Sequence, residues 1–178
     1  MKEISFAAGE LLLAVAWVLI RVICWIRKGR IDWKREAALM LMYINLAVII
    51  RFAFYPFSKV NGQVQPLVFD PDSVFPLRIN LIPFRYLLEY SSRRDLLINI
   101  AGNFGMFVPS GIVLPVICRK PDNFGKTAAA GFLLSLCIET AQLPFAVRAT
   151  DIDDLILNTL GVMTGYGIYR LVKGKKKR

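Results

Sequence analysis

The sequence predicts an all-α integral membrane protein, a bundle of about five transmembrane helices with its N-terminus outside the cell and its C-terminus inside. Hydrophobic residues make up 56% of the 178 residues, and the mean hydropathy is +0.49. Apolar runs recur that are long enough to cross about 30 Å of hydrocarbon as helices. The alternating segments of about ten residues that indicate a membrane β-barrel do not occur.

Five apolar runs define the expected helices. They lie at residues 4–26, 37–57, 95–117, 127–145 and 152–172. The first run is too long for the core of a signal peptide, so we interpret it as a retained helix. Prolines and turn-forming residues make 58–94 a long loop. We therefore divide the chain into an N-terminal helix pair (1–57), this extracellular loop (58–94), and a C-terminal core of three helices with a basic tail (95–178).

Lysine and arginine outside the expected spans set the orientation. Thirteen of them lie in the first loop, the third loop and the tail, and seven lie on the opposite side. Because basic residues are retained in the cytoplasm, the N-terminus is predicted outside. The tail is expected to face anionic lipid headgroups. This distribution of the net charge of +10 between apolar runs indicates a membrane surface and not nucleic acid as the partner.

Composition excludes several kinds of catalytic site. The chain contains no histidine, which removes the usual catalytic base, histidine-based zinc sites and the histidine-dependent membrane phosphatases. Cys24, Cys118 and Cys137 lie in or at the ends of apolar runs and show neither metal-binding spacing nor a disulfide framework. We expect no metal and no cofactor.

Each expected span carries a polar or charged side chain at a similar depth. Counted at 1.5 Å of rise per residue, the side chains about 9–12 Å below the outer helix ends are Glu10, Arg51, Asn103, Glu139 and Asn158. Such groups are costly in hydrocarbon and usually face the bundle interior or a wet cavity. The sequence therefore predicts a polar layer below the outer surface.

Helical spacing adds further members to this layer. Asn99 shares a face with Asn103, Gln142 shares one with Glu139, and Asp151, Asp154 and Asn158 form one stripe. Arg148, in the turn between the last two spans, is placed to reach these carboxylates. Asp153 points away from the stripe and is expected to be solvated at the interface.

Two interpretations of the layer stay open. Buried polar side chains often only join helices, at about 1 kcal/mol each, and Asp151 and Asp154 also suit the start of a helix. Alternatively the layer lines a ligand cavity, because a scaffold rarely needs full charges in lipid. Gly161 and Gly165 form a G-x-x-x-G pair that permits close helix approach.

Three blocks of the chain resemble the VanZ-like family. They are NLIPF at 80–84, NIAGNFGMFVPSG at 99–111, and ETAQ, DIDD and NTLG within 139–161. Ser110 departs from the family pattern, which often has phenylalanine there, and the first two spans carry no signature. The resemblance, over about residues 80–172, implies a multi-pass protein of the bacterial cytoplasmic membrane. The family's founding member is associated with resistance to the glycopeptide teicoplanin, and the resemblance implies no reaction.

Three functions fit these observations. The first, which we favour, is binding of an amphipathic envelope molecule, a lipid-linked precursor or a glycopeptide. Arg51 and Arg148 would meet its phosphate or carboxylate, and the Glu, Asn and Gln side chains its hydroxyls and amides. Transport of such a molecule would need oligomers, because five helices without an internal repeat are few for a transporter.

The other two functions are an enzyme and a scaffold. In a membrane enzyme, Glu139, Asp151 and Asp154 would act as general acid and base or hold a hard cation. In an interaction scaffold, the polar layer would only pack helices and recruit partners.

Overall fold

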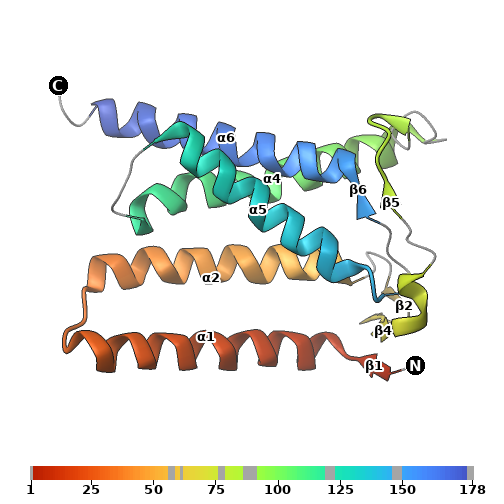
Figure 1. Ribbon diagram of the computed structural model, residues 1–178, viewed down its shortest axis with the longest axis horizontal. Helices are drawn as coiled ribbons and strands as arrows, with labels where there is room; N and C mark the ends of the chain where they lie inside the picture. Colours follow the sequence, from red (N-terminus) through yellow and green to blue (C-terminus); the bar gives the residue numbers. More distant parts are fainter. Residues whose placement is uncertain are drawn as a thin grey trace.

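The computed structural model describes residues 2–55, 59–60, 62–75, 79–85, 92–118, 123–145 and 150–175. These residues form five α-helices along the long axis of the molecule (Figure 1). Their bounds are α1 Phe6–Lys28, α2 Trp33–Phe54, α4 Arg93–Ile117, α5 Phe124–Gln142 and α6 Ile152–Lys175. Each helix overlaps one expected span, so the predicted helical bundle is confirmed. The number of membrane crossings and the orientation stay predictions.

Three of the described helices, α1, α2 and α4, are long and apolar enough to cross a membrane. The remaining two, α5 and α6, carry acidic or amide side chains at one end. Glu139 and Gln142 lie near the end of α5, and α6 begins with Asp153 and Asp154. These side chains belong to the buried contacts between helices, described below.

Side-chain caps mark the starts of four helices, and α2, α4 and α5 begin before their expected apolar runs. In the first turn of each of four helices a backbone N–H donates to a cap side chain, and these caps are Ser5, Asp32, Ser92 and Asn123. As a result α2 starts at Trp33 and α5 at Phe124, ahead of the expected residues 37 and 127. Gly29, with φ of 62°, ends α1 in the left-handed conformation.

Short β-pairs lie at the end of the bundle that holds the N-terminus (Figure 1). The antiparallel pairs join β1 (Lys2–Ile4) to β4 (Leu67–Phe69) and β2 (Lys59–Val60) to β3 (Gln63–Val64). The parallel pair joins β5 (Ile79–Asn80) to β6 (Thr150–Asp151). A 3-10 helix, η1 (Pro71–Val74), lies between β4 and β5. Residues of the predicted long loop thus pair both with the N-terminal strand β1 and with β6, which precedes α6.

The backbones of α4 and α6 touch along a row of glycines. A Cβ atom on Gly111 would lie 2.0 Å from the carbonyl oxygen of Val162, and one on Gly165 would lie 2.0 Å from that of Val108. A Cβ on Gly161 would be equally obstructed, 2.2 Å from the carbonyl oxygen of Phe104. The close approach predicted for Gly161 and Gly165 is confirmed, and α4 is the partner.

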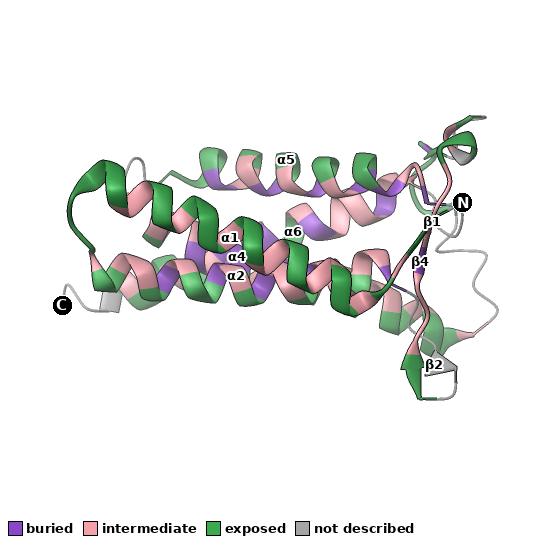
Figure 2. Cartoon of the chain, turned by 90° about the horizontal axis from the view of Figure 1, so that it is seen from below, coloured by how far each residue is buried: buried purple, intermediate pink, exposed green. Residues whose placement is uncertain are grey.

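The buried core lies among α2, α4, α5 and α6, and α1 packs outside it. Ile49, Phe107 and Val162 form a buried cluster, whereas no residue of α1 is buried (Figure 2). Trp17 of α1 contacts Tyr43 of α2, with ring centroids 5.5 Å apart. The first helix is therefore held at the periphery by side chains.

Candidate functional site

Polar side chains of α4, α5 and α6 meet near the end of the bundle that carries the β-pairs, together with side chains of the β5–β6 region. Hydrogen bonds connect them to one another or to the neighbouring backbone. The members of this polar cluster are Asn80, Asn103, Ser135, Glu139, Gln142, Asp151, Asp153, Asp154 and Asn158.

Glu139 and Asp151 join α5 to the start of α6. Glu139 is 3% exposed, and its Oε2 accepts a hydrogen bond of 3.2 Å from the backbone N–H of Asp151. Asp151 Oδ1 in turn accepts bonds of 3.0 Å from Asn80 Nδ2 and from the backbone N–H of Asp153. The second bond is of the kind that caps a helix start, so the structure bears out the capping interpretation for Asp151.

The other two aspartates at the start of α6 also accept hydrogen bonds from neutral groups. Asp153 Oδ1 accepts a bond of 2.7 Å from the backbone N–H of Phe84. With Asp153 only 2% exposed, the expectation that it is solvated is wrong, because the segment 79–85 covers the first turn of α6. Asp154 Oδ1 accepts from Asn103 Nδ2, which joins α6 to α4.

The side-chain amides of Gln142 and Asn158 each donate a hydrogen bond through nitrogen. Gln142 Nε2 donates to the backbone carbonyl of Ala53 in α2 at 2.6 Å, and Asn158 Nδ2 donates to Ser135 Oγ at 2.9 Å. Gln142 Oε1, Asn158 Oδ1 and Asp153 Oδ2 are buried and have no hydrogen-bond partner among the described residues. A buried polar atom without a hydrogen bond lowers the stability of the protein by about 1–3 kcal/mol. A ligand that donated a hydrogen bond to one of these oxygens would remove that cost.

Other predicted site residues lie apart from these contacts or cannot be placed. Arg51 packs on the side of α2 that faces α1: its guanidinium carbon lies 5.5 Å from the ring centroid of Phe6, and Nη1 donates to the Tyr55 carbonyl at 3.3 Å. Asn99 is half-buried, one turn before Asn103. Arg148 lies outside the described residues. Glu10 is in α1, and its buried Oε1 accepts no hydrogen bond from the part of the chain that the structure describes.

The sequence-based prediction missed Ser135 and Asn80, and only Ser135 had a signal in the helical spacing. Ser135 precedes Glu139 by four residues and therefore shares its face of α5. Asn80 belongs to the NLIPF block, but its bond to Asp151 spans 71 residues, and no local pattern indicates that pairing.

A second polar contact, also missed, joins α2 to α4. Asn45 Nδ2 donates to the Met106 carbonyl at 2.8 Å, and Ser110 Oγ donates to Asn45 Oδ1 at 2.5 Å. Ser110 is 0% exposed. The serine that departs from the family pattern is thus part of a buried hydrogen bond between helices.

Two cavities are lined by described residues alone and lie away from the polar cluster, none of whose members lines either of them. One is a groove of about 520 Å³ between α2 and α4, lined by apolar side chains and Asn45. The other is a pocket of about 530 Å³ at the turn from α1 to α2. Among the described residues, no group of three Asp, Glu or Cys side chains is placed to hold a metal ion.

Comparison with known proteins places the chain in a family. A family model described as VanZ/LLP1 matches residues 39–173, from the first turns of α2 almost to the end of α6. The curated "Protein VanZ" of Enterococcus faecium is 34% identical over 93 residues, which are 52% of this chain and 53% of that protein. The chain therefore spans about half the length of this relative. No solved structure matches.

The family match extends the resemblance seen in residues 80–172 into α2, where no signature was recognised. Together with three helices apolar enough to cross a bilayer, it makes the chain a membrane protein. Because the family model covers most of its length, the chain belongs to the VanZ/LLP1 family.

Proposed function

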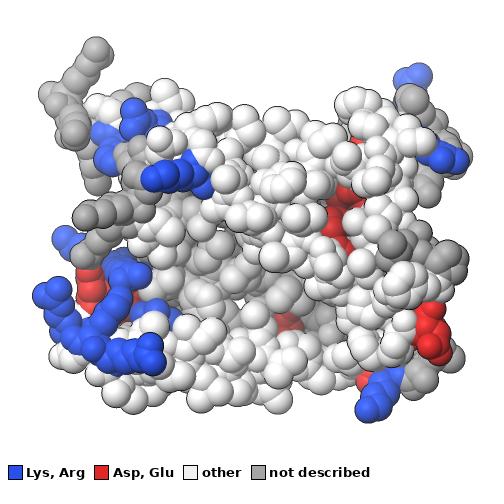
Figure 3. Space-filling model, viewed as in Figure 1, with Lys and Arg blue, Asp and Glu red and all other residues white. Residues whose placement is uncertain are grey.

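We propose that all five helices cross the bacterial cytoplasmic membrane, with the N-terminus outside and the C-terminus inside. On the face drawn in Figure 3, Lys and Arg outnumber the acidic side chains at the end that holds the C-terminus, the opposite end carries both signs of charge, and most of the surface between them is uncharged. Retention of basic residues in the cytoplasm supports this orientation. It places the polar cluster near the outer leaflet.

In this location the polar cluster binds an amphipathic envelope molecule, a lipid-linked precursor or a glycopeptide, and thereby contributes to teicoplanin tolerance. The observation that carries the proposal is the set of buried oxygens on Gln142, Asp153 and Asn158 that no described residue pairs with. All three are acceptors, so the matching ligand presents hydroxyl, amide or ammonium donors. Glycopeptides and sugar-bearing lipids are rich in such groups.

Binding at the cluster involves rearrangement. The unpaired oxygens are buried, so a ligand reaches them only when a neighbouring segment moves. Residues 81–84 are placed to do so, because their side chains are exposed and the described bond that joins them to α6 is the one from the Phe84 N–H to Asp153. Asn80 would stay fixed to Asp151. The apolar tail of the ligand would remain among the lipid chains.

The substitution Asp153→Asn tests this function. It keeps Oδ1 as the acceptor for Phe84 but replaces the unpaired Oδ2 with an amide donor. Asp95→Asn, at an exposed position in the first turn of α4, is the matched control. We expect Asp153→Asn to weaken binding of teicoplanin to the purified chain about tenfold or more and to lower the minimal inhibitory concentration in a susceptible host that expresses it. Asp95→Asn should change neither measurement.

An interaction scaffold is the second candidate, because the amides of Asn103, Gln142 and Asn158 all donate within the protein. In that case Asp153→Asn should shift the unfolding temperature, while wild-type chain neither binds teicoplanin nor changes the susceptibility of its host. That pattern would reject the ligand-binding proposal.

A further inference from the structure

The end of the molecule opposite the polar cluster contains a charged pocket of about 530 Å³. Its walls are the last two turns of α1, the turn 29–32 and the first turn of α2. Because it lies where two apolar helices end, it is at the level of the lipid headgroups. No residue of the polar cluster takes part in it.

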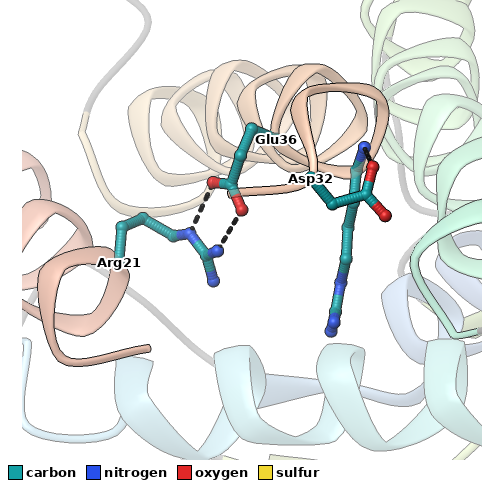
Figure 4. A network of polar contacts seen from close by, with 4 residues as sticks. Arg21, Asp32 and Glu36 are labelled. Carbon is teal, nitrogen blue, oxygen red and sulfur yellow. Dashed lines mark hydrogen bonds and ion pairs between the residues drawn. The ribbon is translucent and has the colours of Figure 1, made fainter. Parts of the chain in front are cut away.

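The lining of this pocket has an excess of positive charge. Its cationic side chains are Arg21, Lys28, Arg30 and Arg35, against two carboxylates, Asp32 and Glu36. Both carboxylates already have partners. Arg21 forms a two-bond ion pair with Glu36, with Nε to Oε2 at 2.9 Å (Figure 4), and Asp32 Oδ1 accepts from the backbone N–H of Arg35 as the N-cap of α2. The four cationic side chains outnumber the two carboxylates, so the lining keeps a net positive charge for another anion.

Two buried donors in the same lining make no hydrogen bond of normal geometry with the described residues. They are Arg35 Nε and Trp25 Nε1, and both lie close enough to Glu36 to interact electrostatically with its carboxylate. Both residues line the pocket, one from α2 and one from α1. A guanidinium and an indole N–H together match an oxyanion with several acceptor atoms, and a phosphate group is the one that membranes supply at this depth.

We propose that this pocket binds the phosphate group of an anionic glycerophospholipid. The guanidinium of Arg35 and the indole N–H of Trp25 donate to the phosphate oxygens, and Lys28 and Arg30 add positive charge. The Arg21–Glu36 pair keeps the ends of the two helices together and so holds the pocket open at a fixed width. The same chemistry would accept free phosphate, which the experiment separates from lipid.

The surface next to the pocket suits the acyl chains of such a lipid. Val18 and Val22 precede Arg21 and Trp25 by three residues each and so lie on the adjoining stripe of α1. They are 57% and 38% exposed, and Ile26, one turn further on, is 76% exposed. A lipid with its phosphate in the pocket can therefore extend along α1.

Paired substitutions test the proposal. Arg35→Gln and Trp25→Phe each remove one of the two buried donors. Lys34→Gln is the control for the lost charge and Trp33→Phe the control for the lost indole, and both positions are exposed and outside the lining. The measurement is native mass spectrometry of the full chain in detergent, titrated with phosphatidylglycerol, with phosphatidylcholine of the same chains, and with inorganic phosphate as competitor. Thermal unfolding of each variant verifies that it is folded. If Arg35→Gln does not fold, Trp25→Phe still tests the proposal, because it replaces one aromatic ring with another.

We expect phosphatidylglycerol to bind wild-type chain more tightly than phosphatidylcholine. Each pocket variant should weaken that binding about tenfold, and the controls should stay within about twofold. Equal losses in Arg35→Gln and Lys34→Gln would overturn the proposal, because they would show that binding follows general surface charge. Displacement of the lipid by an equal concentration of inorganic phosphate would overturn it too, because the site would then serve a soluble anion. Neither result bears on the polar cluster, which lies at the other end.

Discussion

Asn80 and Asp151 lie 71 residues apart in the chain and share a hydrogen bond of 3.0 Å from Asn80 Nδ2 to Asp151 Oδ1. The bond runs across the parallel pair of β5 and β6, in which the same two residues face each other. Asn80 also binds both backbone groups of Ile82, its Nδ2 to the carbonyl and its Oδ1 from the N–H. One buried amide thus shapes the outer loop and fixes it to the start of α6.

Replacement of Asn80 by alanine should lower the free energy of unfolding by about 1–3 kcal/mol, because three hydrogen bonds are lost and Asp151 loses a donor. The measurement is the thermal unfolding of purified protein in detergent. Gln63→Ala, at an exposed position of β3, is the control and should have little effect. Similar unfolding temperatures for the two variants would show that the β5–β6 connection does not stabilise the bundle.

The glycine contacts between α4 and α6 predict a position-specific effect of one added methyl group. At Gly165 the new Cβ would lie 2.0 Å from the Val108 carbonyl oxygen, whereas at Gly167 no atom lies within 4 Å. Gly165→Ala should therefore destabilise the protein by about 3 kcal/mol or more, because backbone must shift. Gly167→Ala should be neutral or slightly stabilising, since alanine favours a helix. Thermal unfolding and size-exclusion chromatography compare the two, and equal behaviour would contradict the packing of α4 on α6.

Asn45 and Ser110 predict an energetic coupling between α2 and α4. Each single substitution, Asn45→Ala or Ser110→Ala, leaves a buried polar partner unmatched, and the double variant removes both. A double-mutant cycle should therefore give a coupling free energy of about 0.5–1.5 kcal/mol, the range found for side-chain hydrogen bonds in membranes. Reversible unfolding measures it, and strictly additive effects would show that the bond contributes nothing.

The helices of this protein follow from its apolar runs, but their ends do not. Hydropathy places five helices because only a helix pairs every backbone group within one segment in lipid. It does not detect caps such as Asp32, which is polar, precedes the apolar run, and starts α2 earlier than expected. Helix ends depend on one side chain and one backbone N–H, and a hydropathy window averages over both.

In the polar cluster, too, the sequence predicts the polar residues but not the partners that they contact. Asn103, Glu139 and Asn158 were identified from depth and helical spacing, and all three make contacts between helices. Which residue each one contacts depends on how the helices are rotated, and the sequence alone does not set that rotation. Asp153 was misplaced for a related reason: its acceptor role comes from Phe84, 69 residues earlier.

The proposed topology predicts alternating accessibility of cysteines along the chain. Cys118, exposed at the end of α4, should react with a membrane-impermeant maleimide only after permeabilisation, in a variant whose other two cysteines are alanine. In a cysteine-free background, Gln63→Cys and Ala141→Cys should react in intact cells, and Gly174→Cys only in permeabilised ones, because α4, α5 and α6 each cross once. All four positions are exposed. Labelling of Cys118 and Gln63→Cys from the same side would mean that α4 does not cross, and labelling of Gly174→Cys in intact cells would reverse the orientation of the C-terminus.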